Sequence, residues 1–106
     1  MKILIVAKDQ RDARFLSGGL VAQGYQADIS KCCEQSLLLA HSSTFDLIVA
    51  DLEQPGIEGV DLCQRLRRQK NGIPLLILSA RAGVTEKVAV LHSGADDYLA
   101  KPYDFD

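Results

Sequence analysis

The stretch FDLIVADLEQPGIEG, residues 45–59, decides the fold. Residues 47–50 are apolar, the run is too short for a helix, and it ends in the carboxylate of Asp51. An apolar run bounded by turn-forming residues is typical of a buried strand in a parallel sheet. Asp51 is therefore predicted at the carboxyl end of a strand, where open α/β sheets bind their ligands. There it can be an acid–base group, a metal ligand, a nucleophile or a loop cap.

Outward from this stretch, short apolar runs alternate with amphipathic segments. Strands are predicted over residues 2–7, 25–30, 46–51, 73–79 and 97–100, and helices over residues 11–23, 34–41, 58–69 and 84–93. Alternating strands and helices predict parallel strands joined by right-handed crossovers. The expected fold class is α/β, a doubly wound five-stranded parallel sheet. Its fifth helix is expected to be missing or to lie beyond residue 106.

Composition narrows the class of protein. The 106 residues suffice for one domain, and 47% hydrophobic with 25% charged residues is ordinary for a globular chain. A net charge of −2 argues against binding nucleic acid through bulk electrostatics. No apolar run approaches the roughly 20 residues of a membrane span, and the amino terminus has no signal-peptide pattern. We therefore expect a cytoplasmic domain over residues 1–106, with its three cysteines reduced.

Three polar side chains follow the last three predicted strands. Asp51, Ser79 and Lys101 should meet at the carboxyl edge of the sheet. The carboxylate can accept a phosphoryl group as an aspartyl phosphate, and the hydroxyl and ammonium can hydrogen-bond its oxygens. The sequence therefore predicts a phosphoryl-handling edge. The Lys101–Pro102 step after a strand also allows a cis peptide bond.

With these residues in place, the chain resembles the CheY-like receiver domains of two-component response regulators, in particular the OmpR/PhoB-like transcription factors. Three motifs carry the resemblance, in order: FDLIVADLEQPGIEG, IPLLILSAR and SGADDYLAKPYDFD. They span residues 45–59, 73–81 and 93–106, and the likeness extends over essentially the whole chain. It implies a flavodoxin-like fold with strand order 2-1-3-4-5.

The resemblance also assigns roles to individual residues. Asp51 matches the phosphoacceptor and Ser79 the switch hydroxyl. Tyr98 matches the switch aromatic, which changes rotamer with that hydroxyl. Lys101 matches the phosphate-binding lysine, and Pro102 is expected to follow a cis bond.

Partners follow from the same resemblance. It implies a sensor histidine kinase, and a homodimer through the helix four–strand five face with Lys87, Asp96 and Asp97 at the interface. DNA would be bound only through a C-terminal domain absent from these residues, and no membrane partner is implied. We expect no enzymatic activity beyond self-catalysed phosphorylation and dephosphorylation of Asp51.

The end of strand one departs from the family pattern. Receivers usually place two adjacent acids there to bind Mg²⁺, whereas this chain has Ala7 and Lys8. Two like charges about 4 Å apart repel by about 4 kcal/mol at an effective dielectric near 20, and a dication beside Lys8 is placed worse. The remaining donors are Asp9, Asp51 and Glu53. We therefore expect a weak or absent Mg²⁺ site.

Alternatives remain open at this edge. We expect the Lys8 ammonium to pair with Asp51, although it can also turn to solvent. Asp9 can restore the metal site through a shifted loop, which would make the domain fully competent for phosphorylation. A third alternative is a stand-alone protein-interaction domain that works without phosphorylation.

Overall fold

The computed structural model describes residues 1–52, 58–69, 72–79 and 84–100. Its elements are β1 (Lys2–Ala7), α1 (Gln10–Ala22), β2 (Gln26–Ser30), α2 (Cys33–Ser42), β3 (Leu47–Asp51), α3 (Val60–Arg68), β4 (Leu75–Ser79), α4 (Val84–His92) and β5 (Asp97–Ala100). Every predicted strand and helix is confirmed, with ends that shift by no more than two residues. The prediction that a fifth helix is missing or lies beyond residue 106 concerns a region outside the described residues.

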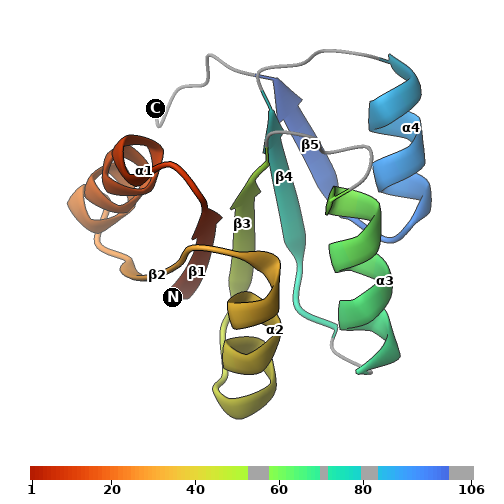
Figure 1. Cartoon of the computed structure of the whole chain (residues 1–106). Helices are drawn as coiled ribbons and strands as arrows, with labels where there is room; N and C mark the ends of the chain where they lie inside the picture. The colour runs from red at the N-terminus through yellow and green to blue at the C-terminus, as the bar shows by residue number, and fades with distance from the viewer. Residues whose placement is uncertain (53–57, 70–71, 80–83, 101–106) are drawn as a thin grey trace.

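The strands form one parallel sheet in the order β2-β1-β3-β4-β5. This order confirms the expected flavodoxin-like topology, with β3 at the centre between β1 and β4 (Figure 1). The register pairs Asp51 with Ala7 on one side and with Leu78 on the other. The ends of β1, β3 and β4 therefore lie side by side at the carboxyl edge, as the sequence predicts.

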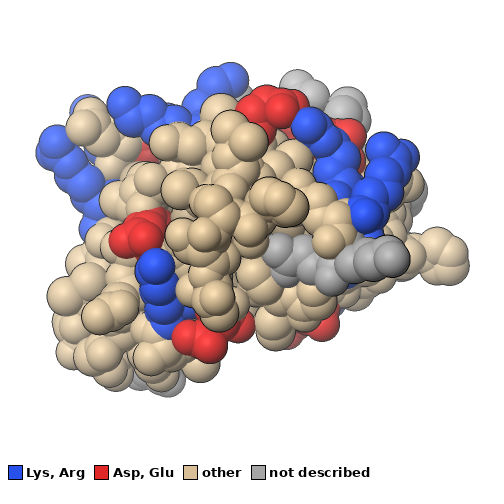
Figure 2. Space-filling model, turned by 90° about the horizontal axis from the view of Figure 1, so that it is seen from below, with Lys and Arg blue, Asp and Glu red and all other residues tan. Residues whose placement is uncertain are grey.

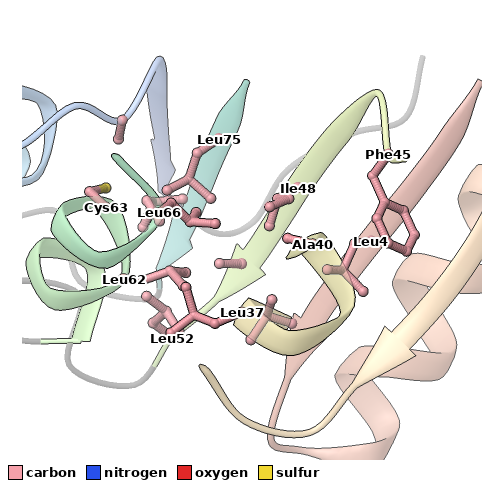
Figure 3. Packing of buried hydrophobic residues seen from close by; sticks show 14 residues of the cluster. Leu4, Leu37, Ala40, Phe45, Ile48, Leu52, Leu62, Cys63, Leu66 and Leu75 are labelled. Carbon is pink, nitrogen blue, oxygen red and sulfur yellow. The ribbon is translucent and has the colours of Figure 1, made fainter. Parts of the chain in front are cut away.

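Helices cover the two faces of the sheet unequally. On one face α2 and α3 pack against the strands with α4 beside α3, whereas α1 lies on the other (Figure 1). The larger core lies under α2 and α3, where Leu62 and Leu66 meet Ile48 and Leu75 of the sheet (Figure 3). The smaller core joins Leu16 of α1 to the opposite face. Burial of these side chains is the main force that fixes both layers.

The apolar residues of α1 do not all face the core. Phe15 and Val21 are more than half exposed, and Ala13 and Leu16 are the buried residues of the helix. Phe15 and Leu16 are adjacent in sequence, and adjacent residues of a helix do not share a face.

One turn at the amino end of the sheet holds α3, β4 and β5 together. Gly94 has a φ of 117°, a left-handed conformation that glycine adopts without strain. A Cβ there would lie 3.3 Å from Nε of Arg67. Arg67 donates to the Gly94 carbonyl at 2.7 Å, and Asp96 accepts from the backbone N–H of Leu75 at 2.7 Å. This contact fixes the start of β4, which ends at the candidate site.

Seen from below in Figure 2, acidic and basic residues lie interspersed, and neither sign forms a continuous block. In the described part of the chain, no helix is both long enough and apolar enough to cross a membrane.

Candidate functional site

Asp51 lies where the sequence predicted it, at the last position of β3. Its side chain is half-buried, and the Oδ2 atom is inaccessible to solvent. On the neighbouring strand, Ser79 ends β4 and is fully buried. The β strands thus bring a carboxylate and a hydroxyl to adjacent strand ends.

Asp51 opens into a cavity of about 240 Å³, here called the Asp51 pocket. Its described lining residues are Val6, Lys8, Lys31, Cys32, Cys33, Glu34, Asp51, Leu52, Glu58 and Asp61. Sequence reasoning did not anticipate the acids from α2 and α3. The only signal for Glu58 and Asp61 is their position at the start of the third helix, which faces the start of the second.

Lys8 and Asp51 line the same cavity, but the predicted ion pair between them is wrong. Among the residues that the structure describes, no Lys8 nitrogen lies within 4.0 Å of an Asp51 oxygen. The Lys8 side chain is exposed. Hydration of the ammonium at this open position competes with the attraction to the half-buried carboxylate.

Asp9 has a structural role. It is the N-cap of α1, and its Oδ1 accepts hydrogen bonds from the backbone N–H groups of Arg11 at 2.7 Å and Asp12 at 3.2 Å. The first N–H groups of a helix have no partner within the helix, so an aspartate at this position satisfies them. Asp9 is not among the described residues that line the Asp51 pocket.

Receivers use Mg²⁺, which proteins hold through one or two carboxylates together with waters and phosphate oxygens. Of the three predicted donors, Asp51 faces the pocket and Asp9 caps α1, while Glu53 lies outside the described residues. Within residues 1–52, 58–69, 72–79 and 84–100, no three His, Cys, Asp or Glu side chains are grouped to hold a metal ion. The Lys8 ammonium in the same lining opposes a divalent cation at the end of β1.

Two thiols also line the Asp51 pocket. Cys32 is exposed and is the N-cap of α2, where its Sγ accepts from the Gln35 backbone N–H at 3.5 Å. Burial, and to a smaller extent the carboxylates of Glu58 and Asp61, raise the pKa of the Cys33 thiol from 9.0 to about 11. Cys33 is therefore almost entirely protonated at neutral pH.

An ion-pair cluster joins the two helices beside this pocket. Both guanidinium nitrogens of Arg65 on α3 contact the carboxylate of Glu34 on α2, and NH1 of Arg65 also lies 3.6 Å from Asp61. These hydrogen bonds, and then the guanidinium charge, lower the pKa of the Glu34 carboxyl below its usual 4.5. The cluster ties the start of α2 to α3.

The remaining predicted residues are placed in part. Lys101 and Pro102 lie outside the described residues. Tyr98 lies in β5, where its backbone pairs with Ile77 of β4. Lys87 of α4 and Asp97 of β5 are exposed.

Asp96, which the resemblance assigned to a dimer interface, makes contacts within its own chain. Its Oδ2 accepts from the Leu75 backbone at 2.7 Å and lies 3.5 Å from NH2 of Arg67.

A five-stranded parallel sheet of this order, with an aspartate at the end of its third strand, defines a receiver-type α/β domain. The model of the response regulator receiver domain family matches residues 3–106. The transcriptional regulatory protein PcoR of Escherichia coli is 41% identical over 104 residues, which cover 98% of this chain and 46% of PcoR. The chain therefore belongs to the response regulator receiver domain family, and it spans less than half of this relative.

Solved structures agree with this assignment. The receiver domain of Francisella response regulator 1452 is 32% identical, with a TM-score of 0.89 over 99% of this chain and 87% of that one. The receiver domain of sensor histidine kinase PA1611 from Pseudomonas aeruginosa PAO1 is 26% identical, with a TM-score of 0.86 over 98% and 87%. That structure contains a magnesium ion coordinated in the active site cleft.

Proposed function

We infer that this chain is the receiver domain of an OmpR/PhoB-like transcriptional regulator in which Asp51 holds the phosphoacceptor position. Mg²⁺-dependent phosphorylation of Asp51 is weakened or lost, because Ala7 and Lys8 replace the usual acidic pair. Family membership and the place of Asp51 at the end of β3 support the first part. The chemistry of the pocket supports the second.

The observation that carries the proposal is the lysine beside the phosphoacceptor position. Lys8 lines the Asp51 pocket from the end of β1, where a receiver needs negative charge for its metal. A cation there repels a divalent cation by several kcal/mol at short range.

The alternative of a fully competent receiver needs Asp9 to bind the metal. Asp9 would then give up its two hydrogen bonds to the start of α1. Loss of an N-cap costs about 0.5–2 kcal/mol, and the metal would have to offset this cost as well as the charge of Lys8. The arrangement at β1 therefore favours the weakened site.

The test is phosphorylation with acetyl phosphate, read by intact mass with and without Mg²⁺. The native chain should gain little or no phosphoryl adduct, whereas Lys8→Asp should gain one that depends on Mg²⁺. A Mg²⁺-dependent adduct on the native chain would overturn the proposal. Its absence from both chains would show that Lys8 is not the cause and would favour a phosphorylation-independent interaction domain.

Two controls make the result specific. Adding Asp51→Ala to Lys8→Asp should abolish the adduct, which locates the phosphoryl group. Lys31→Asp is the matched charge control, since Lys31 lines the same pocket but follows β2 instead of β1. This variant should leave the native response unchanged, whereas restoration by Lys31→Asp would mean that bulk charge, and not the β1 position, controls the site.

The partners belong to the same proposal. A sensor histidine kinase is the expected phosphodonor where phosphorylation persists, and DNA would be bound by a further domain. PcoR is named a transcriptional regulatory protein and is more than twice the matched length, which supports this. Homodimerisation would use the α4–β5 face through the exposed Lys87, Asp96 and Asp97.

A further inference from the structure

A second cavity, of about 610 Å³, lies on the other side of Lys8 from Asp51 and is here called the basic pocket. Its described lining residues are Ala7, Lys8, Gln10, Ala13, Arg14, Ile29, Lys31 and Gln35. Its lining residues come from the carboxyl ends of β1 and β2 and from the first turns of α1 and α2. The Asp51 side chain is not among this lining.

The charged residues in the described lining of this pocket all have one sign. Lys8, Arg14 and Lys31 contribute three cations, and no carboxylate is among the described residues that line it. Within the described part of the chain, none of these three cations forms an ion pair. Asp12 is the acid in the first turn of α1, and the N-cap Asp9 directs its Oδ1 to the helix backbone. The pocket therefore has positive charge that its own lining does not neutralise.

Two helices of 13 and 10 residues begin at this pocket, so their positive dipole ends add to the side-chain charge. Asp9 offsets this charge at α1. At α2 the cap is Cys32, and the Gln35 side chain accepts from the Lys31 backbone N–H at 3.0 Å. This bond holds the β2–α2 connection, and with it Lys31, at the pocket.

Apolar surface lies beneath the basic rim. Ala7 and Ala13 are buried, and Ile29 is 40% exposed. The volume falls within the roughly 300–1,000 Å³ of small-molecule sites, which combine apolar walls with a few polar groups. An inorganic ion needs neither this volume nor these walls. The pocket suits a molecule with one flat apolar part and one anionic part.

We propose that the basic pocket binds a phosphate-bearing small molecule of the nucleotide class, with its phosphates on Lys8, Arg14 and Lys31 and its base against Ile29. Guanidinium and ammonium groups are the usual phosphate ligands of proteins. The site goes beyond the proposed function, because its lining excludes Asp51 and no group transfer is involved. A soluble ligand would thereby contact Lys8 at the end of β1.

The test is isothermal titration calorimetry of the native chain with ADP, pyrophosphate and adenosine, in buffer without Mg²⁺. ADP should bind saturably, pyrophosphate more weakly, and adenosine weakest. Arg14→Gln combined with Lys31→Gln should weaken ADP binding by at least about ten-fold, since two of the three phosphate ligands are lost. Higher NaCl should weaken it too, because the charges are exposed.

Three variants keep the outcome interpretable. Arg14→Lys with Lys31→Arg keeps the charge and should keep ADP binding, while Arg11→Gln with Arg68→Gln removes two exposed cations elsewhere and should leave it unchanged. Asp51→Ala should also bind normally, which separates this site from the proposed phosphorylation. Absence of saturable binding by ADP, or equal affinity in Arg14→Gln with Lys31→Gln, would overturn the proposal.

Discussion

The Asp51 pocket and the basic pocket share Lys8 and Lys31, yet their other linings have opposite character. Among the described residues, the Asp51 pocket adds the carboxylates of Glu34, Asp51, Glu58 and Asp61 and two thiols. The basic pocket adds an arginine, two amides and apolar surface, and none of its described lining is acidic. The two lysines therefore mark a boundary of charge along one edge of the sheet.

The walls of the two pockets also differ in how they are held. The Asp51 pocket is bounded by α3, which packs on the larger core through Leu62, Cys63 and Leu66. The basic pocket is bounded by α1, which packs on the smaller core chiefly through Ala13 and Leu16. Truncating a core side chain of α3, beside Asp51, should therefore lower the free energy of unfolding more than truncating one of α1.

The largest expected effect is on the free energy of unfolding, when a core side chain of α3 or α1 is truncated. Leu62→Ala should lower the free energy of unfolding by about 2–5 kcal/mol, because it removes a fully buried side chain and leaves a cavity. Leu16→Ala should fall toward the lower end of that range, since its smaller core can collapse more readily. Urea unfolding followed by circular dichroism measures both.

Leu38→Ala is the matched control for these two variants, because Leu38 is 72% exposed. It should change the free energy of unfolding by no more than about 0.5 kcal/mol. If Leu16→Ala lowered the free energy of unfolding clearly more than Leu62→Ala, the prediction that α3 is held more firmly than α1 would be wrong.

A second contrast lies within the Asp51 pocket, between its two thiols. Cys32 is exposed, whereas the pKa of Cys33 is raised to about 11 by burial and neighbouring acids. Two pH units above the ordinary value of 9.0 correspond to about 100-fold less thiolate, the form that reacts. Iodoacetamide at mildly alkaline pH should therefore label Cys32 long before Cys33 or the buried Cys63.

Peptide mapping by mass spectrometry gives the labelling rate of each cysteine. In denaturant the three rates should converge, which is the control for intrinsic reactivity. Glu58→Gln should raise the native labelling rate of Cys33, because one carboxylate that opposes its thiolate is gone. Equal labelling rates for Cys32 and Cys33 in the native chain would contradict the raised pKa of Cys33.

Much of the fold was predictable because its signals are local. The run that ends at Asp51 is apolar and short, and the helix of Leu62, Cys63 and Leu66 has clear periodicity. The face of α1 was less predictable, since apolar Phe15 and Val21 point to solvent while Ala13 is buried. Composition alone does not tell which of several apolar residues a helix turns inward.

The sequence predicts which residues of the site lie at strand ends, but it does not predict the contacts that their side chains make. Sequence order places Asp51 and Ser79 at one edge, because parallel strands share a direction. It does not show that Lys8 stays apart from Asp51, or that Arg65 joins α2 to α3. Such contacts depend on how exposed side chains divide between water and neighbours, a balance of about 1 kcal/mol that a pattern does not contain.

The smallest expected effect concerns the cluster that closes one side of the Asp51 pocket. In the folded chain Arg65 lowers the pKa of Glu34 below its usual 4.5, first through hydrogen bonds and then through its charge. A group whose folded pKa is depressed contributes stability above the unfolded pKa and loses it as the pH falls through the folded value. Arg65→Gln should therefore be slightly less stable than the native chain near neutral pH, and the difference should vanish in acid.

The measurement is the urea midpoint of both chains at a series of pH values from about 7 down to below the usual pKa range of a glutamate. Arg68→Gln is the matched control on the same helix, since Arg68 is exposed and makes no ion pair with a described residue. It should lack the pH-dependent difference. Because the pair is exposed, added salt should shrink the effect as well. A difference between Arg65→Gln and the native chain that grew toward acid pH would show that the cluster stabilises a protonated form, contrary to the depressed pKa of Glu34.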